Sequence, residues 1–305
     1  MEAREKFTGL NSLKFNRQFQ TDEDCYKYLS EIKWQSGYSC KKCGHTKYYK
    51  GVKPYSRRCM RFKYDESPTA GTMFDKCKFS LLIAFHIIFK ISTKKKWMSS
   101  EELSEEFELR QKTCWEFKWK IQQAMRSSRR YPLTGTVQVD EFLIGEYEEW
   151  KQGRNNKSKK RLVIVAIEIL EKGGVGRAYA QVIERASNIE FQPFFNTYIN
   201  PDAHVVTDEW TGYKPLKKKY PLLEQVPSQK GKGLKELHIH IMNIQSWLRG
   251  IHHHCTKERL QGYLDEYHFR YNRRAFMEDI FDLIIKRMVE YKPIRLKNNN
   301  VNRGA

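Results

Sequence analysis

The central part of the chain alternates between apolar runs typical of β-strands and segments with helical periodicity. Runs rich in Val, Ile and Leu predict strands over 136–144, 161–170 and 177–183, separated by turn-forming Gly, Asn and Lys residues. Apolar residues at helical spacing predict a helix over 189–198, and a short strand follows at 203–207. These elements predict a mixed sheet with helices packed on its faces.

Two amphipathic helices are predicted after the last strand. A Lys- and Gly-rich loop over 214–235 leads to a helix at 237–250, and a final helix is predicted at 257–273. Beyond about Lys286 the chain is basic and rich in Asn, which predicts a tail without regular structure. The order of strands and helices predicts a mixed α/β fold of the ribonuclease-H-like class.

The segment before the sheet has a helical pattern. The run 79–91 is apolar nearly all round and predicts a buried helix, and the spacing of Ser99 and Glu102 predicts a capping box at the start of the next one. A further helix is predicted after Arg110, which gives the pattern of a helix-turn-helix; a plain helical hairpin is the alternative. The second helix of a helix-turn-helix enters the major groove of DNA. The candidate DNA contacts on this helix are Gln111, Lys112, Thr113 and Lys118.

The cysteines predict a metal-binding ribbon near the N-terminus. A capping box at Thr21 opens a helix, and the pair Cys40 and Cys43 then has the spacing of a zinc knuckle, with Cys59 following after a predicted hairpin. Phe62 stands where a fourth cysteine would complete the site. Two interpretations remain open: a structural zinc site, or a zinc-free ribbon held by its aromatic residues. The candidate zinc ligands are Cys40, Cys43, Cys59 and His45, with Cys77 as another substitute for the missing ligand.

Composition indicates a nucleic-acid partner. The 56 Lys and Arg residues exceed the 36 Asp and Glu residues and give a net charge of +20, and 17 Tyr, 17 Phe and 7 Trp residues are interspersed with them. A field of this size attracts polyanions, and aromatic rings stack on bases. The longest apolar run is too short to span a bilayer and no apolar N-terminal segment is present, so we expect a cytoplasmic protein without a membrane partner.

Two acidic residues end apolar β-type runs and predict an oxygen-rich metal site. Asp140 closes the run 136–139 (TVQV) and Asp208 closes the run 204–207 (HVVT), while Asn243 lies on the following helix. The two carboxylates share a site only if the two strands end side by side. Hard cations such as Mg²⁺ prefer oxygen ligands, which favours Asn243 as the third ligand over His240, the alternative on the same helix. The alternative for all three is a structural role in turns and caps.

Four segments of the chain resemble bacterial insertion-sequence transposases of the ISXO-like group. They are 139–145 (VDEFLIG), 207–213 (TDEWTGY), 243–254 (NIQSWLRGIHHH) and 262–274 (GYLDEYHFRYNRR). The similarity extends to the ribbon and to the segment 67–74. The resemblance implies a ribonuclease-H-like catalytic domain with an Asp-Asp-Glu type triad, in which some members replace Glu by Asn or His and add a downstream basic residue. Carried over by position, the catalytic residues are Asp140, Asp208, Asn243 and Arg249, with Mg²⁺ or Mn²⁺ held by the first three.

The resemblance implies a transposase that binds the terminal inverted repeats of its element and catalyses metal-dependent cleavage and strand transfer on double-stranded DNA. The resemblance also implies a nucleoid-associated bacterial protein, and we expect a homodimer or larger assembly because two ends must be cut together. The candidate phosphate contacts outside the helix-turn-helix are Arg249, His252, Arg273 and Arg274. The predicted domains are a helix plus zinc-ribbon-like module at 1–75, a helix-turn-helix-like DNA-binding region at 76–130, the ribonuclease-H-like catalytic domain at 131–275, and a basic C-terminal helix end and tail at 276–305.

Three other functions remain open from the sequence. A catalytically inactive DNA-binding regulator could keep the ribbon and the helix-turn-helix, and a ribonuclease-H-like nuclease could hydrolyse DNA without joining it. A tyrosine recombinase using Tyr263 or Tyr267 is the third, and the position of both residues on an inner helical stripe disfavours it.

Overall fold

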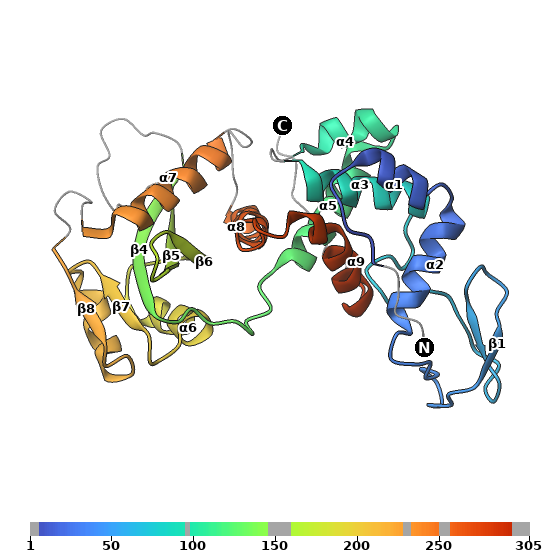
Figure 1. Cartoon of the computed structure of the whole chain (residues 1–305), viewed down its shortest axis with the longest axis horizontal. Helices are drawn as coiled ribbons and strands as arrows, with labels where there is room; N and C mark the ends of the chain where they lie inside the picture. Colours follow the sequence, from blue (N-terminus) through green and yellow to red (C-terminus); the bar gives the residue numbers. More distant parts are fainter. Residues whose placement is uncertain (1–5, 95–97, 146–159, 228–232, 250–256, 295–305) are drawn as a thin grey trace, which may run out of the picture. The chain divides into compact units, whose positions relative to one another are not determined.

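The computed structural model describes residues 6–94, 98–145, 160–227, 233–249 and 257–294. The chain divides into two compact units (Figure 1). One consists of Met1–Ala124 together with Phe276–Ala305, and the other is Met125–Ala275.

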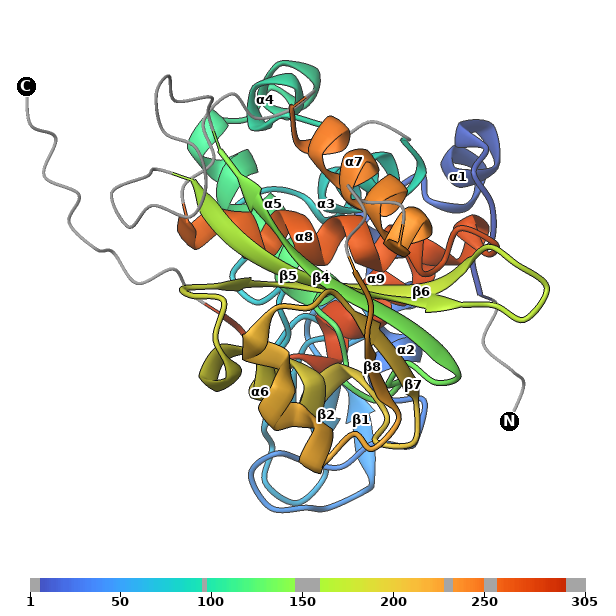
Figure 2. The same cartoon turned by 90° about the vertical axis from the view of Figure 1, so that its left-hand side faces the viewer.

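The second unit is built on a five-stranded sheet (Figure 2). Its strands are β4 (Thr136–Ile144), β5 (Arg161–Ile169), β6 (Val175–Ile183), β7 (His204–Thr207) and β8 (Leu223–Gln225). The order across the sheet is β6-β5-β4-β7-β8, in which β4, β5 and β6 are antiparallel neighbours and β7 and β8 run parallel to β4. The predicted mixed α/β fold is confirmed.

Helices cover both faces of this sheet. On one face α6 (Asn188–Tyr198) and the 3₁₀ helix η1 (Thr211–Lys218) form a core with the apolar side chains of β4, including Val137 and Val139. On the other face lie α7 (Lys235–Arg249), which packs on β4 and β5, and α8 (Lys257–Tyr271), which packs on β6. Because side chains alternate along a strand, the polar residues of β4 at 138 and 140 belong to the face that α7 covers.

The segment predicted as a loop over 214–235 is more regular than its composition suggests. It contains most of η1 and the strand β8, whose Leu223 is buried in the core and pairs with Val205 of β7. A three-residue strand is too short to show a period of two, so its pattern could not separate it from the Lys-rich residues around it. The predicted irregular loop was therefore wrong for this part.

The first unit contains the ribbon. Its strands β1 (Tyr48–Lys50), β2 (Arg57–Cys59) and β3 (Asp65–Glu66) form a three-stranded antiparallel sheet, in agreement with the predicted hairpin. Trp34 and Tyr38 pack against the cysteines of the ribbon and form a small apolar cluster with them. The aromatic residues therefore contribute to the ribbon beside whatever the cysteines bind.

Two helices of the first unit begin at capping residues that the sequence predicts. The helices that precede β4 are α1 (Ser12–Gln18), α2 (Asp22–Lys33), α3 (Leu81–Thr93), α4 (Ser100–Phe107) and α5 (Gln111–Met125). Both predicted capping boxes are present, at the starts of α2 and α4. A three-residue turn joins α4 to α5. In the described part of the chain, no helix combines the length and the apolar character that crossing a membrane requires.

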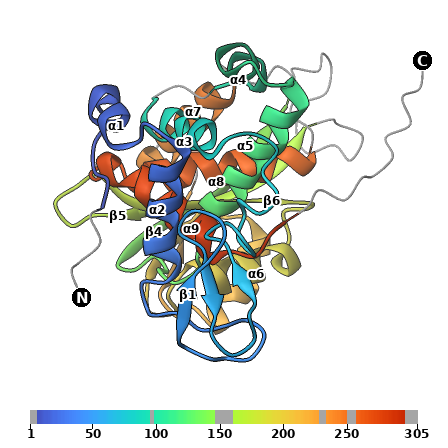
Figure 3. The same cartoon turned by 90° about the vertical axis from the view of Figure 1, so that its right-hand side faces the viewer.

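A further helix, α9 (Ile280–Glu290), lies where the sequence predicts only a helix end and a fraying tail. It lies beside α2 and α3 (Figure 3). Its Phe281 is buried and its ring contacts those of Phe7, Phe15 and Phe85, while Asp282 accepts a hydrogen bond from the hydroxyl of Tyr28. The prediction that 257–273 forms the last helix was wrong. The apolar stripe of α9 was masked by the basic composition that follows it, and its packing partners are residues more than 190 positions earlier in the sequence.

Candidate active site and metal centre

Asp140 and Asp208 come from neighbouring strands. β4 and β7 are parallel, and their last paired residues are Val139 and Thr207. Asp140 is the next residue of β4 and Asp208 is the first residue after β7, so the two follow the same rung of the ladder. The prediction that Asp140 closes its strand was wrong: β4 continues to Ile144, and Asp140 pairs with Val165 of β5, so it lies in the middle of β4 beside the end of β7.

Hydrogen bonds to the backbone hold both aspartates. The side chain of Asp140 is 14% exposed, and its Oδ1 accepts a bond from the N–H of Glu141 at 2.7 Å. Oδ1 of Asp208 accepts a bond from the N–H of Trp210 at 3.1 Å. Gln225 of β8 donates to the carbonyl oxygens of Asp208 and Trp210, each at 3.0 Å, and so fixes the turn after β7.

Glu141 and Tyr213 join the two acidic segments on the opposite face of the sheet. The buried Tyr213 hydroxyl donates a hydrogen bond of 2.5 Å to Oε2 of Glu141, and its ring stacks on Phe191 with centroids 4.5 Å apart. Burial is the main reason that the pKa of Tyr213 lies well above its ordinary value, and the charges of Glu141, Asp140 and Asp208 raise it further. Neither Glu141 nor Tyr213 was predicted from the sequence to have a role. Both lie in the segments 139–145 and 207–213 that resemble transposases, and this position could have identified them.

The side chain of α7 that reaches Asp140 is His238. Its Nε2 lies 3.9 Å from Oδ2 of Asp140, and its side chain is 37% exposed. Two hydrogen bonds fix α7 along β4: the N–H of Leu237 donates to Oε1 of Gln138 at 3.2 Å, and Nε2 of Gln245 donates to the carbonyl oxygen of Leu143 at 3.4 Å. His238 was not predicted from the sequence. Its position seven residues before Gln245 places both side chains on one flank of the helix, and this spacing could have identified it.

The two predicted third ligands lie elsewhere on α7. His240 is buried against α8, with its Nε2 3.2 Å from Nε2 of His268, and burial followed by the charges of His268 and Arg274 lowers its pKa to about 3. Asn243 is exposed, and it lies about 140° around the helix from His238 at 100° per residue. Neither has a contact to the two aspartates among those observed in the described residues.

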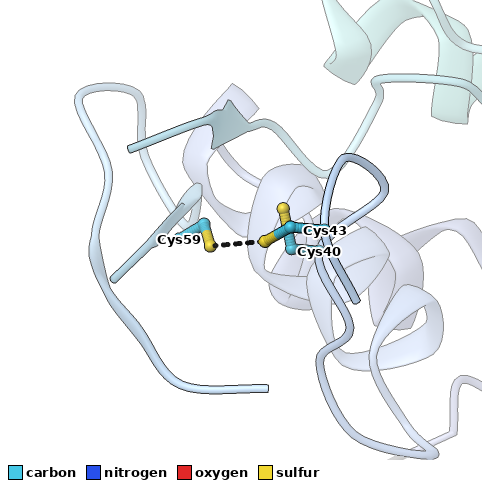
Figure 4. Close-up of side chains that lie close together, drawn as sticks. All are labelled: Cys40, Cys43 and Cys59. Atoms are coloured by element: carbon cyan, nitrogen blue, oxygen red, sulfur yellow. Dashed lines mark hydrogen bonds between the residues drawn. The ribbon is translucent and has the colours of Figure 1, made fainter. Parts of the chain in front are cut away.

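Three cysteines of the ribbon form a second site (Figure 4). The sulfur atoms of Cys40, Cys43 and Cys59 all lie within 4.8 Å of one another, with 3.6 Å between those of Cys43 and Cys59. Burial opposes ionisation of Cys40, but the N–H groups of Lys42 and Cys43 outweigh it and lower the pKa of Cys40 to about 7. Three convergent sulfur ligands, one of them readily ionised, fit a thiophilic divalent metal such as Zn²⁺.

His45 and Cys77 are not members of this group. The carbonyl oxygen of His45 accepts a hydrogen bond from the N–H of Cys40 at 3.0 Å, so the residue contributes to the knuckle through its backbone. Cys77 is half-buried, and its thiol lies in the field of Asp22 and Lys120.

Both sites fall inside regions that match known families. Residues 132–272 match the family model of the ISXO2-like transposase domain, and residues 20–61 match that of the transposase zinc-ribbon domain. The chain therefore carries an ISXO2-like transposase domain with an N-terminal transposase zinc ribbon. A DDE-type transposase domain is a phosphoryl-transfer enzyme, and the acidic pair at 140 and 208 lies within it.

The chain is also similar to a solved structure. The crystal structure of the Mos1 mariner paired end complex with Mn is similar over 63% of this chain and 72% of that chain, with 13% sequence identity and a TM-score of 0.29. Comparison with curated proteins found no match.

The basic candidates of the ISXO2-like domain differ in how exposed they are. Arg249 is exposed at the end of α7, and it lies on the same flank as His238 and Gln245, with its Nη2 3.5 Å from Oε1 of Gln245. The guanidinium of Arg273 stacks on Phe269 and donates to its carbonyl oxygen. Arg274 donates to carbonyl oxygens of α8 and β6 and so ties the end of the helix to the sheet. His252 lies outside the described residues.

The candidates on α5 also separate into two groups. Gln111 and Lys112 are exposed and Thr113 is half-buried at the start of the helix, where Nε2 of Gln111 donates to Oγ of Ser100 at 2.9 Å. Lys118 is buried, and its Nζ donates to the carbonyl oxygen of Met98 at 2.8 Å. Lys118 is thus turned into the first unit, where it has no surface to offer to DNA.

Proposed function

We propose that this protein is the transposase of an insertion sequence, which binds the terminal inverted repeats of its element and catalyses DNA cleavage and strand transfer. The observation that carries the proposal is the parallel pairing of β4 with β7, after which Asp140 and Asp208 follow the same rung. A pair of carboxylates that follow the same rung of two parallel strands, inside a matched transposase domain, is a suitable site for phosphodiester chemistry.

Asp140 and Asp208 are the residues that would hold Mg²⁺ or Mn²⁺, because carboxylate oxygens are the ligands that these cations prefer. When bound, such metals activate the attacking oxygen and stabilise the leaving oxygen. The hydrogen bonds from Glu141 and Trp210 to the two aspartates fix their carboxylates before any metal arrives. This order in the free site favours the proposed role.

The third position of the site belongs to α7. Asn243 is the residue that the family resemblance assigns, and His238 is the one whose ring lies 3.9 Å from Asp140. We favour His238 as the residue that orients the carboxylate of Asp140, with Arg249 on the same flank of α7 as a phosphate contact. His238→Ala should then reduce cleavage by about 10- to 100-fold, and Asn243→Ala by much less. Equal losses in both variants, or a loss in Asn243→Ala alone, would return the third position to Asn243.

DNA binding is proposed for the first unit, and the net charge of +20 of the chain supports it. The helices α4 and α5, joined by a three-residue turn, have the pattern of a helix-turn-helix, and Gln111, Lys112 and Thr113 at the start of α5 are the proposed contacts. Because two element ends are cut together, a dimer or larger assembly on double-stranded DNA is part of the proposal.

The test uses the full chain with DNA that carries the ends of the element. Wild-type protein and Mg²⁺ should give nicked ends and then products joined to target DNA, and Asp140→Asn and Asp208→Asn should bind the ends but yield neither. Asp202→Asn is the matched control, because this exposed aspartate lies just before β7 and should leave both products unchanged.

Other results would select another function. Nicking without joined products would indicate a nuclease, and binding without nicking would indicate a regulator. A covalent protein–DNA adduct would indicate a tyrosine recombinase. Each of these outcomes contradicts the proposal.

A further inference from the structure

The two turns that present the ribbon cysteines have the same backbone. In the first, the N–H of Gly44 donates to the carbonyl oxygen of Cys40 at 2.8 Å, and the N–H of Cys40 donates to that of His45 at 3.0 Å. In the second, the N–H of Lys63 donates to the carbonyl oxygen of Cys59 at 3.0 Å, and the N–H of Cys59 donates to the carbonyl oxygen of Tyr64 at 2.9 Å. The sequence separations are identical, four and five residues in each turn.

Both turns direct a backbone N–H at the cysteine sulfur, and both have a left-handed residue. The N–H of Lys42, two residues after Cys40, lies 3.4 Å from its sulfur, and the N–H of Phe62, three residues after Cys59, lies 3.3 Å from its sulfur. Gly44 and Lys63, at the same place in their turns, have φ values of 69° and 56°. A left-handed conformation costs a lysine more than a glycine, so the second turn keeps this shape against a local preference.

The two turns carry different side chains at the position of the second ligand. Phe62 occupies the place in the second turn that Cys43 occupies in the first, and its side chain is 57% exposed. Among the described His, Cys, Asp and Glu residues, none joins Cys40, Cys43 and Cys59 within ligand distance. Three sulfur ligands leave a tetrahedral metal with one open position.

We propose that the ribbon binds one thiophilic divalent metal through Cys40, Cys43 and Cys59 alone, and that water fills an exchangeable fourth position beside Phe62. The site differs in this respect from a closed four-ligand structural zinc site, and it resembles the coordination of sites that keep one position for an external ligand. The inference concerns the ribbon and does not depend on the transposition reaction.

The test is a Co²⁺ titration of the metal-free full-length protein, since Co²⁺ replaces Zn²⁺ and reports its ligands through absorption. Wild type should bind one Co²⁺ with a thiolate charge-transfer band about three quarters as intense as that of Phe62→Cys, because the band counts sulfur ligands. Phe62→Cys should bind Zn²⁺ roughly 100-fold more tightly in competition with a chelator. Phe62→Ser is the matched control, because it removes the ring without adding a thiol and should bind as wild type does.

An external ligand provides a second measurement. Added imidazole or a small thiol should change the Co²⁺ spectrum of wild type and leave that of Phe62→Cys unchanged, because only the former has an open position. Thermal unfolding of each variant verifies that it folds. Phe62 is exposed, so we expect its substitution to leave the fold intact.

Three results would overturn the inference. The first is a wild-type protein that binds no Co²⁺. The second is an affinity that His45→Ala or Cys77→Ser lowers as much as Cys59→Ser does, which would identify a fourth protein ligand. The third is a Phe62→Cys variant that binds no more tightly than Phe62→Ser.

Discussion

At the scale of single residues, the Glu141–Tyr213 hydrogen bond connects the two segments that supply the acidic pair. Glu141 follows Asp140 directly, and Tyr213 lies five residues after Asp208. The bond lies in the apolar core of the second unit, where a hydrogen bond to a charged group contributes more than it does at the surface. It therefore holds the segment after β7 against the middle of β4.

Tyr213→Phe should remove this bond while keeping the ring stacked on Phe191. We expect the free energy of unfolding to fall by about 1–3 kcal/mol. We also expect nicking to slow about tenfold at an unchanged affinity for DNA, because the aspartates lose their alignment. Thermal unfolding and single-turnover nicking measure the two effects.

Tyr220→Phe is the control for this variant. Tyr220 is buried in the same core, and its hydroxyl has no hydrogen-bond partner among the described residues. Its loss should leave both measurements nearly unchanged. A Tyr213→Phe variant that behaves like Tyr220→Phe would show that the bond positions nothing.

At the scale of elements, the sequence predicted those whose patterns are long and periodic. The bounds of β4 match the prediction at both ends, and α2 and α4 begin at the predicted capping residues because a cap is a local contact. β8 and α9 were missed because one is too short for periodicity and the other is defined by partners far away in the chain.

The candidate site divides in the same way. The strand patterns identified Asp140 and Asp208 but left their adjacency as a condition, which the parallel register of β4 with β7 meets. The rotation of α7 did not follow, because its apolar stripe leaves two flanks open and only the structure shows that His238 faces Asp140.

The α7–α8 contact should make the second unit sensitive to acid. Burial lowers the pKa of His268 to about 4, while an unfolded His titrates near 6.5, so the unfolded chain binds one proton more between these values. Stability should fall as pH drops from about 6.5 to 4, by up to about 3 kcal/mol from this residue.

His268→Gln should reduce the slope of unfolding free energy against pH in this interval by about one proton. Gln removes the titrating ring and keeps a donor for the carbonyl oxygen of Leu264, which His268 contacts at 2.7 Å. His204→Gln, at an exposed site, is the control. An unchanged slope in His268→Gln would show that the ring is not buried as described.

At the scale of the whole molecule, the two ends of the chain form one unit around an aromatic core. Phe281 of α9 contacts the ring of Phe7, near the N-terminus, and the ring of Phe85 in α3. The chain therefore leaves this unit, forms the transposase domain and returns to the first unit. The transposase domain is in this sense an insertion between α5 and α9. The N-terminal unit should therefore depend on the C-terminal helix.

Phe281→Ala should lower the free energy of unfolding of this unit by about 3–5 kcal/mol, because it leaves a cavity in the aromatic core. Phe276→Ala is the matched control at an exposed position and should cost about 0.5 kcal/mol or less. Amide hydrogen exchange resolves the two units separately. Loss of protection confined to α9 itself would contradict a shared core.

The most direct test of the central claim is cleavage of the protein by a metal bound at the acidic pair. Fe²⁺ in place of Mg²⁺, with ascorbate and peroxide, generates radicals that cut the backbone close to the bound ion. We predict cuts near Asp140 and Asp208 and on α7 near His238, which excess Mg²⁺ suppresses and Asp140→Asn abolishes, while cuts near the ribbon cysteines persist. Cuts that avoid both aspartates, or that are unchanged in Asp140→Asn, would contradict a metal held between Asp140 of β4 and Asp208 after β7.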